Sequence, residues 1–180
     1  MQNDSESNRP YIEAIKLAAG SVQYKNLSVK TTFMDAISHL YQHYTNSGNI
    51  QYLETATLHI QAYLEMGFPY DDGEELYNLI LEKLGTTKEL KFPHKFYSAK
   101  KIKLNKAQVK SMIKKWPASS HQKIKIDEVV TDIIEKVRKK ENGIFYYECV
   151  VTNDMYELVI SEKETFFHDL GRGIFYTFIL

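Results

Sequence analysis

Cysteine is almost absent from this chain of 180 residues, which contains Cys149 and no other. A single thiol cannot form an internal disulfide, and it cannot build a cysteine-based zinc site within one chain. This usage is typical of a reducing compartment, so we expect a cytoplasmic protein. Cys149 alternates with Phe145 and Tyr147, a pattern that predicts a small buried hydrophobe on a strand rather than a nucleophile.

Long apolar runs are also missing. The longest nearly unbroken run, Ile174 to Leu180, has seven residues, whereas a membrane-spanning helix needs about 20. The first ten residues, Met1 to Pro10, are polar and acidic and lack a basic start, so they do not resemble a secretory signal. We interpret them as a flexible leader, and we expect no membrane partner.

Recognised catalytic motifs are lacking as well: the sequence has no phosphate-binding glycine-rich loop, no nucleophile elbow and no dinucleotide-binding fingerprint. His39 and His43 have the four-residue spacing of paired metal ligands, and His59 follows on the next predicted helix. However, Leu40 stands where zinc proteases carry their glutamate, and the three imidazoles need not converge. We therefore predict no metal site and no cofactor.

One loop does combine an acid, a base and a cation, because His168 and Asp169 are followed closely by Arg172. Adjacent residues seldom direct their side chains at each other, and Gly-Arg-Gly before a strand is typical of a turn. An enzyme with a site near His168–Arg172 therefore stays an alternative hypothesis, and we assign no catalytic residue.

Hydrophobic periodicity predicts an α+β fold, with a helical N-terminal half that contains a helical hairpin and a small antiparallel β-sheet at the C-terminus. The final uncharged segment is typical of a strand buried on both faces, and we expect it to pair with the preceding β-hairpin. The predicted helices span 32–48, 49–67, 72–84, 105–116 and 127–140, and the predicted strands span 144–151, 155–160 and 174–180. Along the chain we distinguish a flexible leader (1–10), a helical region (11–87), a basic segment with two helices (88–142) and a C-terminal antiparallel β region (143–180), together forming one compact unit.

Positive charge is concentrated in one segment although the whole chain is formally neutral. Residues 88–125 contain twelve lysines, a single acidic residue and no arginine, whereas both flanking regions are acidic. Lys106, Lys110 and Lys114 lie four residues apart in a predicted helix and so share one face. The predicted binding surface consists of Lys103, Lys106, Lys110, Lys114, Lys115 and Trp116.

Clustered lysines favour an anionic partner, and the missing arginine argues against reading of base sequence. We therefore expect a non-enzymatic cytoplasmic binding or regulatory protein that acts through protein–protein contacts, such as an inhibitor or immunity-type protein, with its lysines against an acidic protein surface. The alternative is sequence-tolerant binding to an RNA or DNA backbone. The acidic flanks leave two further readings open, namely self-association and a solvated lysine face that is neutralised within the molecule.

Overall fold

A computed structural model describes residues 8–21, 26–85, 99–113, 120–149 and 152–180. Its α-helices and one 3-10 helix are α2 (Arg9–Ser21), α3 (Asn26–Ser47), α4 (Gln51–Glu65), η1 (Tyr70–Gly73), α5 (Glu74–Leu84), α6 (Lys106–Met112) and α7 (Ser120–Lys139). Its strands are β1 (Lys100–Lys103), β2 (Gly143–Cys149), β3 (Asp154–Ile160), β4 (Thr165–Asp169) and β5 (Ile174–Ile179). Among the described helices, none is both long and apolar enough to cross a membrane.

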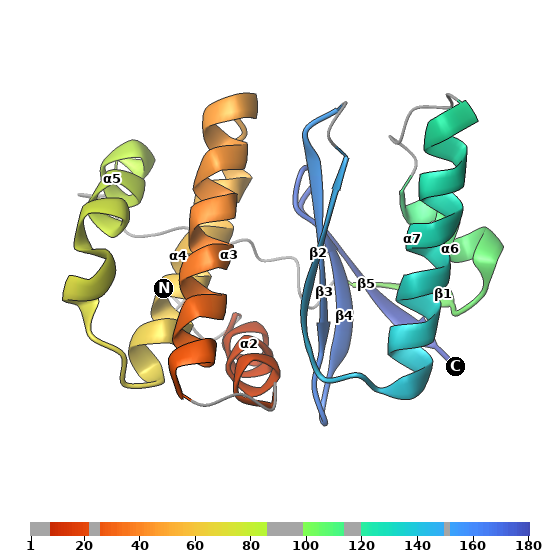
Figure 1. Ribbon diagram of the computed structural model, residues 1–180, viewed down its shortest axis with the longest axis horizontal. Helices are drawn as coiled ribbons and strands as arrows, with labels where there is room; N and C mark the ends of the chain where they lie inside the picture. The colour runs from red at the N-terminus through yellow and green to blue at the C-terminus, as the bar shows by residue number, and fades with distance from the viewer. Residues whose placement is uncertain (1–7, 22–25, 86–98, 114–119, 150–151) are drawn as a thin grey trace, which may run out of the picture.

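The five strands form one mixed sheet in the order β1-β5-β4-β3-β2. Strands β2 to β5 follow one another as antiparallel neighbours, and β1 joins the far edge parallel to β5. The sheet stands between two layers of helices, with α2 to α5 on one side and α6 and α7 on the other (Figure 1).

Each face of the sheet is covered by its own core. The first core packs α2, α3, α4 and α5 against side chains such as Val159 and Phe166, and the second packs α6 and α7 against Leu158 and Phe167. Successive residues of a strand point to opposite faces, so neighbouring apolar residues in β3 and β4 serve different cores. This explains why β3 is buried along nearly its whole length instead of alternating with polar residues.

Helix α4 is the central helix of its layer, where it packs against α2, α3 and α5. Its neighbours leave ten of its fifteen residues buried, including His59. The turn that precedes it begins at Gly48, whose φ of 69° is readily adopted by glycine. The Asn49 side chain accepts a hydrogen bond from the N–H of Gln51 and donates one to the carbonyl of Gly171. The second bond joins this turn to the turn between β4 and β5.

The α+β class and the N-terminal helical hairpin are confirmed, and so are the predicted strand positions at β2, β3 and β5. Two expectations about the sheet are wrong. The last strand does not pair with the β2–β3 hairpin, because β4 lies between them, and the sheet is mixed because β1 runs parallel to β5. A four-residue strand that carries three lysines has little of the apolar signal by which strands are recognised.

Further differences concern the helices. Helix α2 was not predicted, and it begins at Arg9, inside the segment interpreted as a leader. Helix α7 begins seven residues earlier than expected. Ends of helices are the least reliable part of such expectations, because a helix can extend past its apolar stripe wherever packing supports it.

Because both cores are built on one sheet, we expect the protein to unfold as a single cooperative unit. Ile15→Ala in the first core and Ile133→Ala in the second, both at fully buried positions, should each lower the free energy of unfolding by about 2–5 kcal/mol. The exposed substitution Gln42→Ala on α3 should change it by less than about 0.5 kcal/mol. Urea unfolding followed by far-ultraviolet and near-ultraviolet circular dichroism checks this, and non-coincident transitions in either core variant would contradict it.

Candidate functional site

The described part of the predicted lysine surface lies at the β1 edge of the sheet. Lys103 ends β1, Lys106 begins α6, and both side chains are exposed. Lys100 and Lys101 on the same strand are exposed as well, although the sequence prediction did not include them. In the part of the chain that the structure describes, no ion pair neutralises any of these four ammonium groups, which we call the lysine edge.

Lys110 behaves differently from its neighbours. Its Nζ lies 2.9 Å from Oδ1 of Asp127 on α7, so an acidic residue of the C-terminal flank neutralises part of the predicted row. Both partners are largely exposed, and such a pair stabilises a protein by about 0–1 kcal/mol. Lys114, Lys115 and Trp116 lie outside the described residues.

The backbone groups of Lys103, at the C-terminal end of the lysine edge, are occupied by contacts within the chain. The N–H of Leu104 donates to the carbonyl of Ile179 on β5, so by alternation the backbone of Lys103 faces away from the sheet. Gln108 accepts the Lys103 N–H through Oε1 at 2.5 Å, and the N–H of Asn105 donates to the Lys103 carbonyl at 2.9 Å. The backbone groups of Lys103 are therefore satisfied within the chain, while its ammonium group is exposed.

A second polar cluster lies sealed between the first-core helices and the sheet. Glu157, in the middle of β3, is fully buried, and its Oε1 lies 2.8 Å from Nε2 of His59 on α4. The hydroxyl of Tyr11 on α2 donates to Glu157 Oε2 at 2.6 Å. Tyr146 of β2 adds a third contact, with its hydroxyl 3.3 Å from Oε1 and 3.1 Å from the His59 nitrogen. Groups from α2, α4 and β2 thus meet at one carboxylate.

The geometry sets how many protons this cluster holds. His59 Nδ1 lies 2.9 Å from the carbonyl of Thr55, which can only accept, so Nδ1 carries a proton. A second proton must then lie between Nε2 and Glu157 Oε1. Burial favours neutral groups, but the charge of Glu157 outweighs it and raises the pKa of His59 above 6.5. Burial likewise opposes the charge of Glu157, yet His59 lowers the pKa of that carboxyl well below 4.5, so both shifts favour the ion-paired form of the two groups.

The two tyrosines act as permanent donors to this pair. Burial, and after it the charge of Glu157, raises the pKa of both Tyr11 and Tyr146 well above 10. Both hydroxyls therefore keep their protons across the physiological pH range. A buried ion pair is tolerated when further hydrogen bonds satisfy its remaining lone pairs, which these hydroxyls do.

His168 lies beside the cluster without joining it. Its ring stacks on Phe175 with centroids 3.9 Å apart, and its Nδ1 is 3.8 Å from Glu157 Oε2, too far for a hydrogen bond. Neither ring nitrogen has a hydrogen-bond partner among the described residues. Burial lowers the pKa of His168 below 6.5, so this imidazole is neutral at neutral pH.

Asp169 faces the opposite side of the sheet from His168. Its carboxylate accepts from Arg172 twice, from Nε at 2.5 Å and from the backbone N–H at 2.9 Å. The same guanidinium donates to the carbonyl of Met112, which joins the β4–β5 turn to the end of α6. The His168–Arg172 loop therefore does not present an acid and a base to one common point.

The three histidines considered for a metal site also separate. His39 Nδ1 and His43 Nε2 lie 3.2 and 3.3 Å from Oε1 of Glu148, while His59 points to Glu157 in the interior. Among the described residues, no group of three or more histidine, cysteine, aspartate or glutamate side chains is arranged to hold a metal ion. Cys149 is buried in the second core, as its strand pattern predicted.

Sequence reasoning missed the Glu157 cluster altogether. One signal was present, since Glu157 is a charged residue inside an otherwise apolar stretch of β3, and such residues are rarely buried without a partner. The partners come from positions up to 146 residues away along the chain, so no local pattern could have named them.

Comparisons with known proteins add no assignment. A scan against protein-family models, a search of curated proteins and a search of solved structures each found no match to this chain.

Removing the central carboxylate should destabilise the fold strongly. Glu157→Leu leaves His59, Tyr11 and Tyr146 without their acceptor, and we expect the free energy of unfolding to fall by about 3–5 kcal/mol at pH 7. Glu157→Gln retains an acceptor and should lose less, and Glu75→Gln on the surface of α5 is the matched control. Urea denaturation measures all three, and a loss below about 1 kcal/mol in the leucine variant would contradict the role given to the ion pair.

His168 should contribute a defined pH dependence. Its pKa is lowered in the folded state, so below pH 6.5 the unfolded chain takes up a proton that the folded chain excludes, and stability falls. His168→Leu removes this penalty. The free energy of unfolding of the variant, minus that of the unmodified protein, should therefore increase by up to about 2 kcal/mol when the pH is lowered from 7.5 to 5. His59 contributes a pH dependence of the opposite sign. Because its pKa is raised in the folded state, its protonation stabilises the fold at low pH, and this contribution is lost as the pH rises through the folded-state pKa.

Urea titrations of both proteins at the two pH values test this prediction. Ile133→Ala in the second core removes no titratable group and leaves the His168 ring stack in place, so its effect should be independent of pH. If the stability difference caused by His168→Leu were the same at both pH values, His168 would not be the buried neutral group described here.

Proposed function

We propose that this protein is a non-enzymatic binding or regulatory protein whose lysine edge docks against an acidic protein surface. The observation that supports the proposal is the lysine edge itself, with Lys100, Lys101, Lys103 and Lys106 exposed together at the meeting of β1 and α6. Clustered cations of this kind raise the local concentration of anionic partners and speed association.

The rigidity of the lysine edge supports a recognition role. Asn105 caps α6 by accepting the N–H of Gln108, and Gln108 in turn holds the backbone of Lys103. These bonds join the end of β1 to the first turn of α6 and so restrict how Lys103 moves relative to Lys106. A preorganised surface loses less conformational entropy when it binds a partner.

The sealed position of the Glu157 cluster supports a non-enzymatic role. Glu157 and His59 are both inaccessible to solvent. An acid–base pair can act on a substrate only within hydrogen-bond reach of it. The pair instead joins the first helical layer to the sheet, a structural role.

The described surroundings of the lysine edge favour protein over nucleic acid. Single-stranded nucleic acids are typically held by exposed aromatic rings and arginine planes as well as by charge. Here Ile102 and Phe178 pack against the second core, and Arg172 is engaged by Asp169 and the Met112 carbonyl. The lysines thus supply charge without a stacking platform in this part of the chain.

Charge removal tests the proposal. Lys101→Gln, Lys103→Gln and Lys106→Gln together should weaken binding to a polyglutamate probe by about threefold to a hundredfold, because exposed charge contacts contribute about 0.2–1 kcal/mol each. The control removes three positive charges elsewhere, through Lys83→Gln, Arg138→Gln and Lys163→Gln, and should bind as the unmodified protein does. Fluorescence anisotropy at low salt provides the measurement.

A single-stranded oligonucleotide of matched charge is the competing probe in the same assay. If the oligonucleotide binds more tightly than polyglutamate and loses affinity steeply as salt rises, the result would indicate a nucleic-acid partner instead of a protein. If the lysine-edge variant and the control variant bound each probe equally well, the lysine edge would not be the contact surface.

A further inference from the structure

The two edges of the sheet differ in how they are protected. The β1 edge is short, carries three lysines and is capped by Gln108, which are common means of preventing edge-to-edge pairing. The β2 edge has seven residues in unbroken register with β3, without lysine, proline or a bulge. Strand β2 therefore has the features of an edge that accepts another strand.

The open backbone groups of β2 can be identified from one hydrogen bond. The N–H of Leu170 donates to the carbonyl of Met155, so Met155 directs its backbone towards β4. Alternate residues of β3 then face β2, beginning with Tyr156, whose partner is Tyr147. It follows that the odd-numbered residues of β2 bond to β3. The outward N–H and C=O groups are those of Ile144, Tyr146 and Glu148, and none has a backbone partner among the described residues.

These three residues are spaced symmetrically about Tyr146. If a second β2 strand lies antiparallel with Tyr146 opposite Tyr146, Ile144 of each chain faces Glu148 of the other. Every open N–H then meets an open C=O in the pattern of an antiparallel ladder. We propose that two copies of this chain associate through their β2 edges, with a two-fold axis at Tyr146, to form one continuous sheet.

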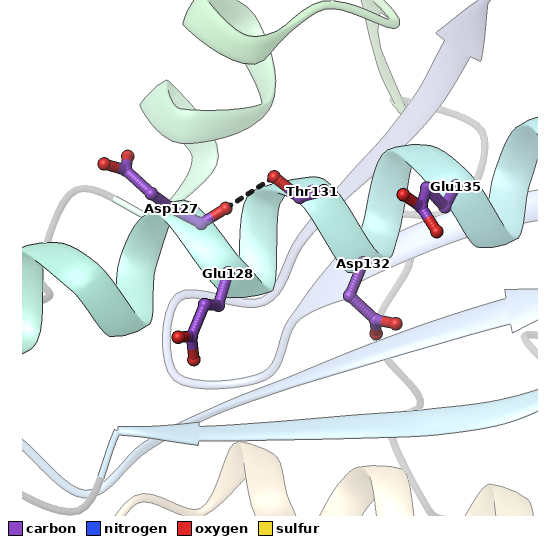
Figure 2. Close-up of a pocket in the computed structure, with 5 residues that line it drawn as sticks. All are labelled: Asp127, Glu128, Thr131, Asp132 and Glu135. Carbon is purple, nitrogen blue, oxygen red and sulfur yellow. Dashed lines mark hydrogen bonds between the residues drawn. The ribbon is translucent and has the colours of Figure 1, made fainter.

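The charge pattern of α7 fits the same axis. Acidic residues lie in its middle, at Asp127, Glu128, Asp132 and Glu135, and basic residues end it, at Lys136, Arg138 and Lys139, with Lys140 immediately after. The acidic residues line a surface hollow, and Glu128 and Asp132 point from α7 towards the side on which the strands lie (Figure 2).

Two contacts align α7 with β2. The Tyr147 hydroxyl donates to Asp132 at 2.7 Å, and Lys136 Nζ lies 4.9 Å from the centre of the Phe145 ring. Tyr146 is therefore level with residue 134, midway between Asp132 and Lys136. The two-fold axis places the two α7 helices antiparallel on the same face of the joined sheet. Each residue of one helix then lies level with the residue of the other helix that is equally far from residue 134 in the opposite direction along the chain.

This alignment brings opposite charges to the same level. Asp132, which pairs with Lys136 of its own chain, is level with Lys136 of the partner subunit, and Glu128 is level with Lys140 of the partner subunit. Residues 128–132 of each α7 thus face residues 136–140 of the other. A strand from an unrelated protein would match the open backbone of β2 but would meet this charge pattern only by coincidence.

Sedimentation velocity of the full chain over a range of micromolar concentrations tests for the dimer, and amide hydrogen exchange identifies its interface. We expect concentration-dependent dimers in which the amides of Ile144, Tyr146 and Glu148 become protected as dimer forms. The amides of Phe145 and Tyr147 bond to β3 and should be protected in both states. A monomer at every concentration, or a dimer in which the three outward amides exchange as in the monomer, would overturn the proposal.

A charge exchange tests the alignment of the helices. Glu128→Lys places like charges at both ends of the symmetric contact and should weaken the dimer by about tenfold. The double variant Glu128→Lys, Lys140→Glu restores opposite charges and should recover the affinity. Glu75→Lys on α5, also exposed, is the matched control and should dimerise normally. Failure of the double variant to recover dimerisation, with its fold intact by circular dichroism, would overturn the two-fold arrangement.

Discussion

The ion pair between Glu157 and His59 is the constraint on which the arrangement of the first helical layer depends. A carboxylate without solvent contact requires partners at fixed positions, and they come from α2, α4 and β2. Apolar packing alone would tolerate a shift of a helix along the sheet, whereas a shift that broke these short contacts would leave a charge unpaired in the interior. The cluster therefore specifies how α2 and α4 lie on β3, and the apolar core around it provides most of the burial.

The surface charges follow from how the sheet divides the molecule. The lysine edge projects from the β1 side, while the acidic residues 127–135 of α7 project near β2, so a chain of zero formal net charge has two regions of opposite sign. One internal pair, Lys110 with Asp127, partly joins them. Docking of an acidic partner at β1 and pairing of two copies at β2 use opposite edges of the sheet, so neither excludes the other.

The sequence alone predicted those elements whose apolar periodicity and turn residues lie within one short stretch of chain. The helices that end at Gly48 and Gly85 and the β2–β3 hairpin were predicted because apolar periodicity and turn residues lie within a few positions of each other. The partner strand of β5 was mispredicted, because strand order is set by how the chain returns through the turn at 170–173. The lysine edge was only partly predicted, since Lys100 and Lys101 join Lys103 and Lys106 through the position of β1 beside β5.

The sequence by itself determined the α+β class, the segregation of charge along the chain and the buried character of Cys149, because each depends on composition or on neighbours in the chain. Only the tertiary structure decided that Glu157 meets His59, that His168 and Asp169 face opposite sides of the sheet, and that one sheet edge is capped while the other is open. The physical reason is distance along the chain. Contacts between residues about a hundred positions apart depend on the packing of whole elements, and no spacing rule within the sequence encodes them.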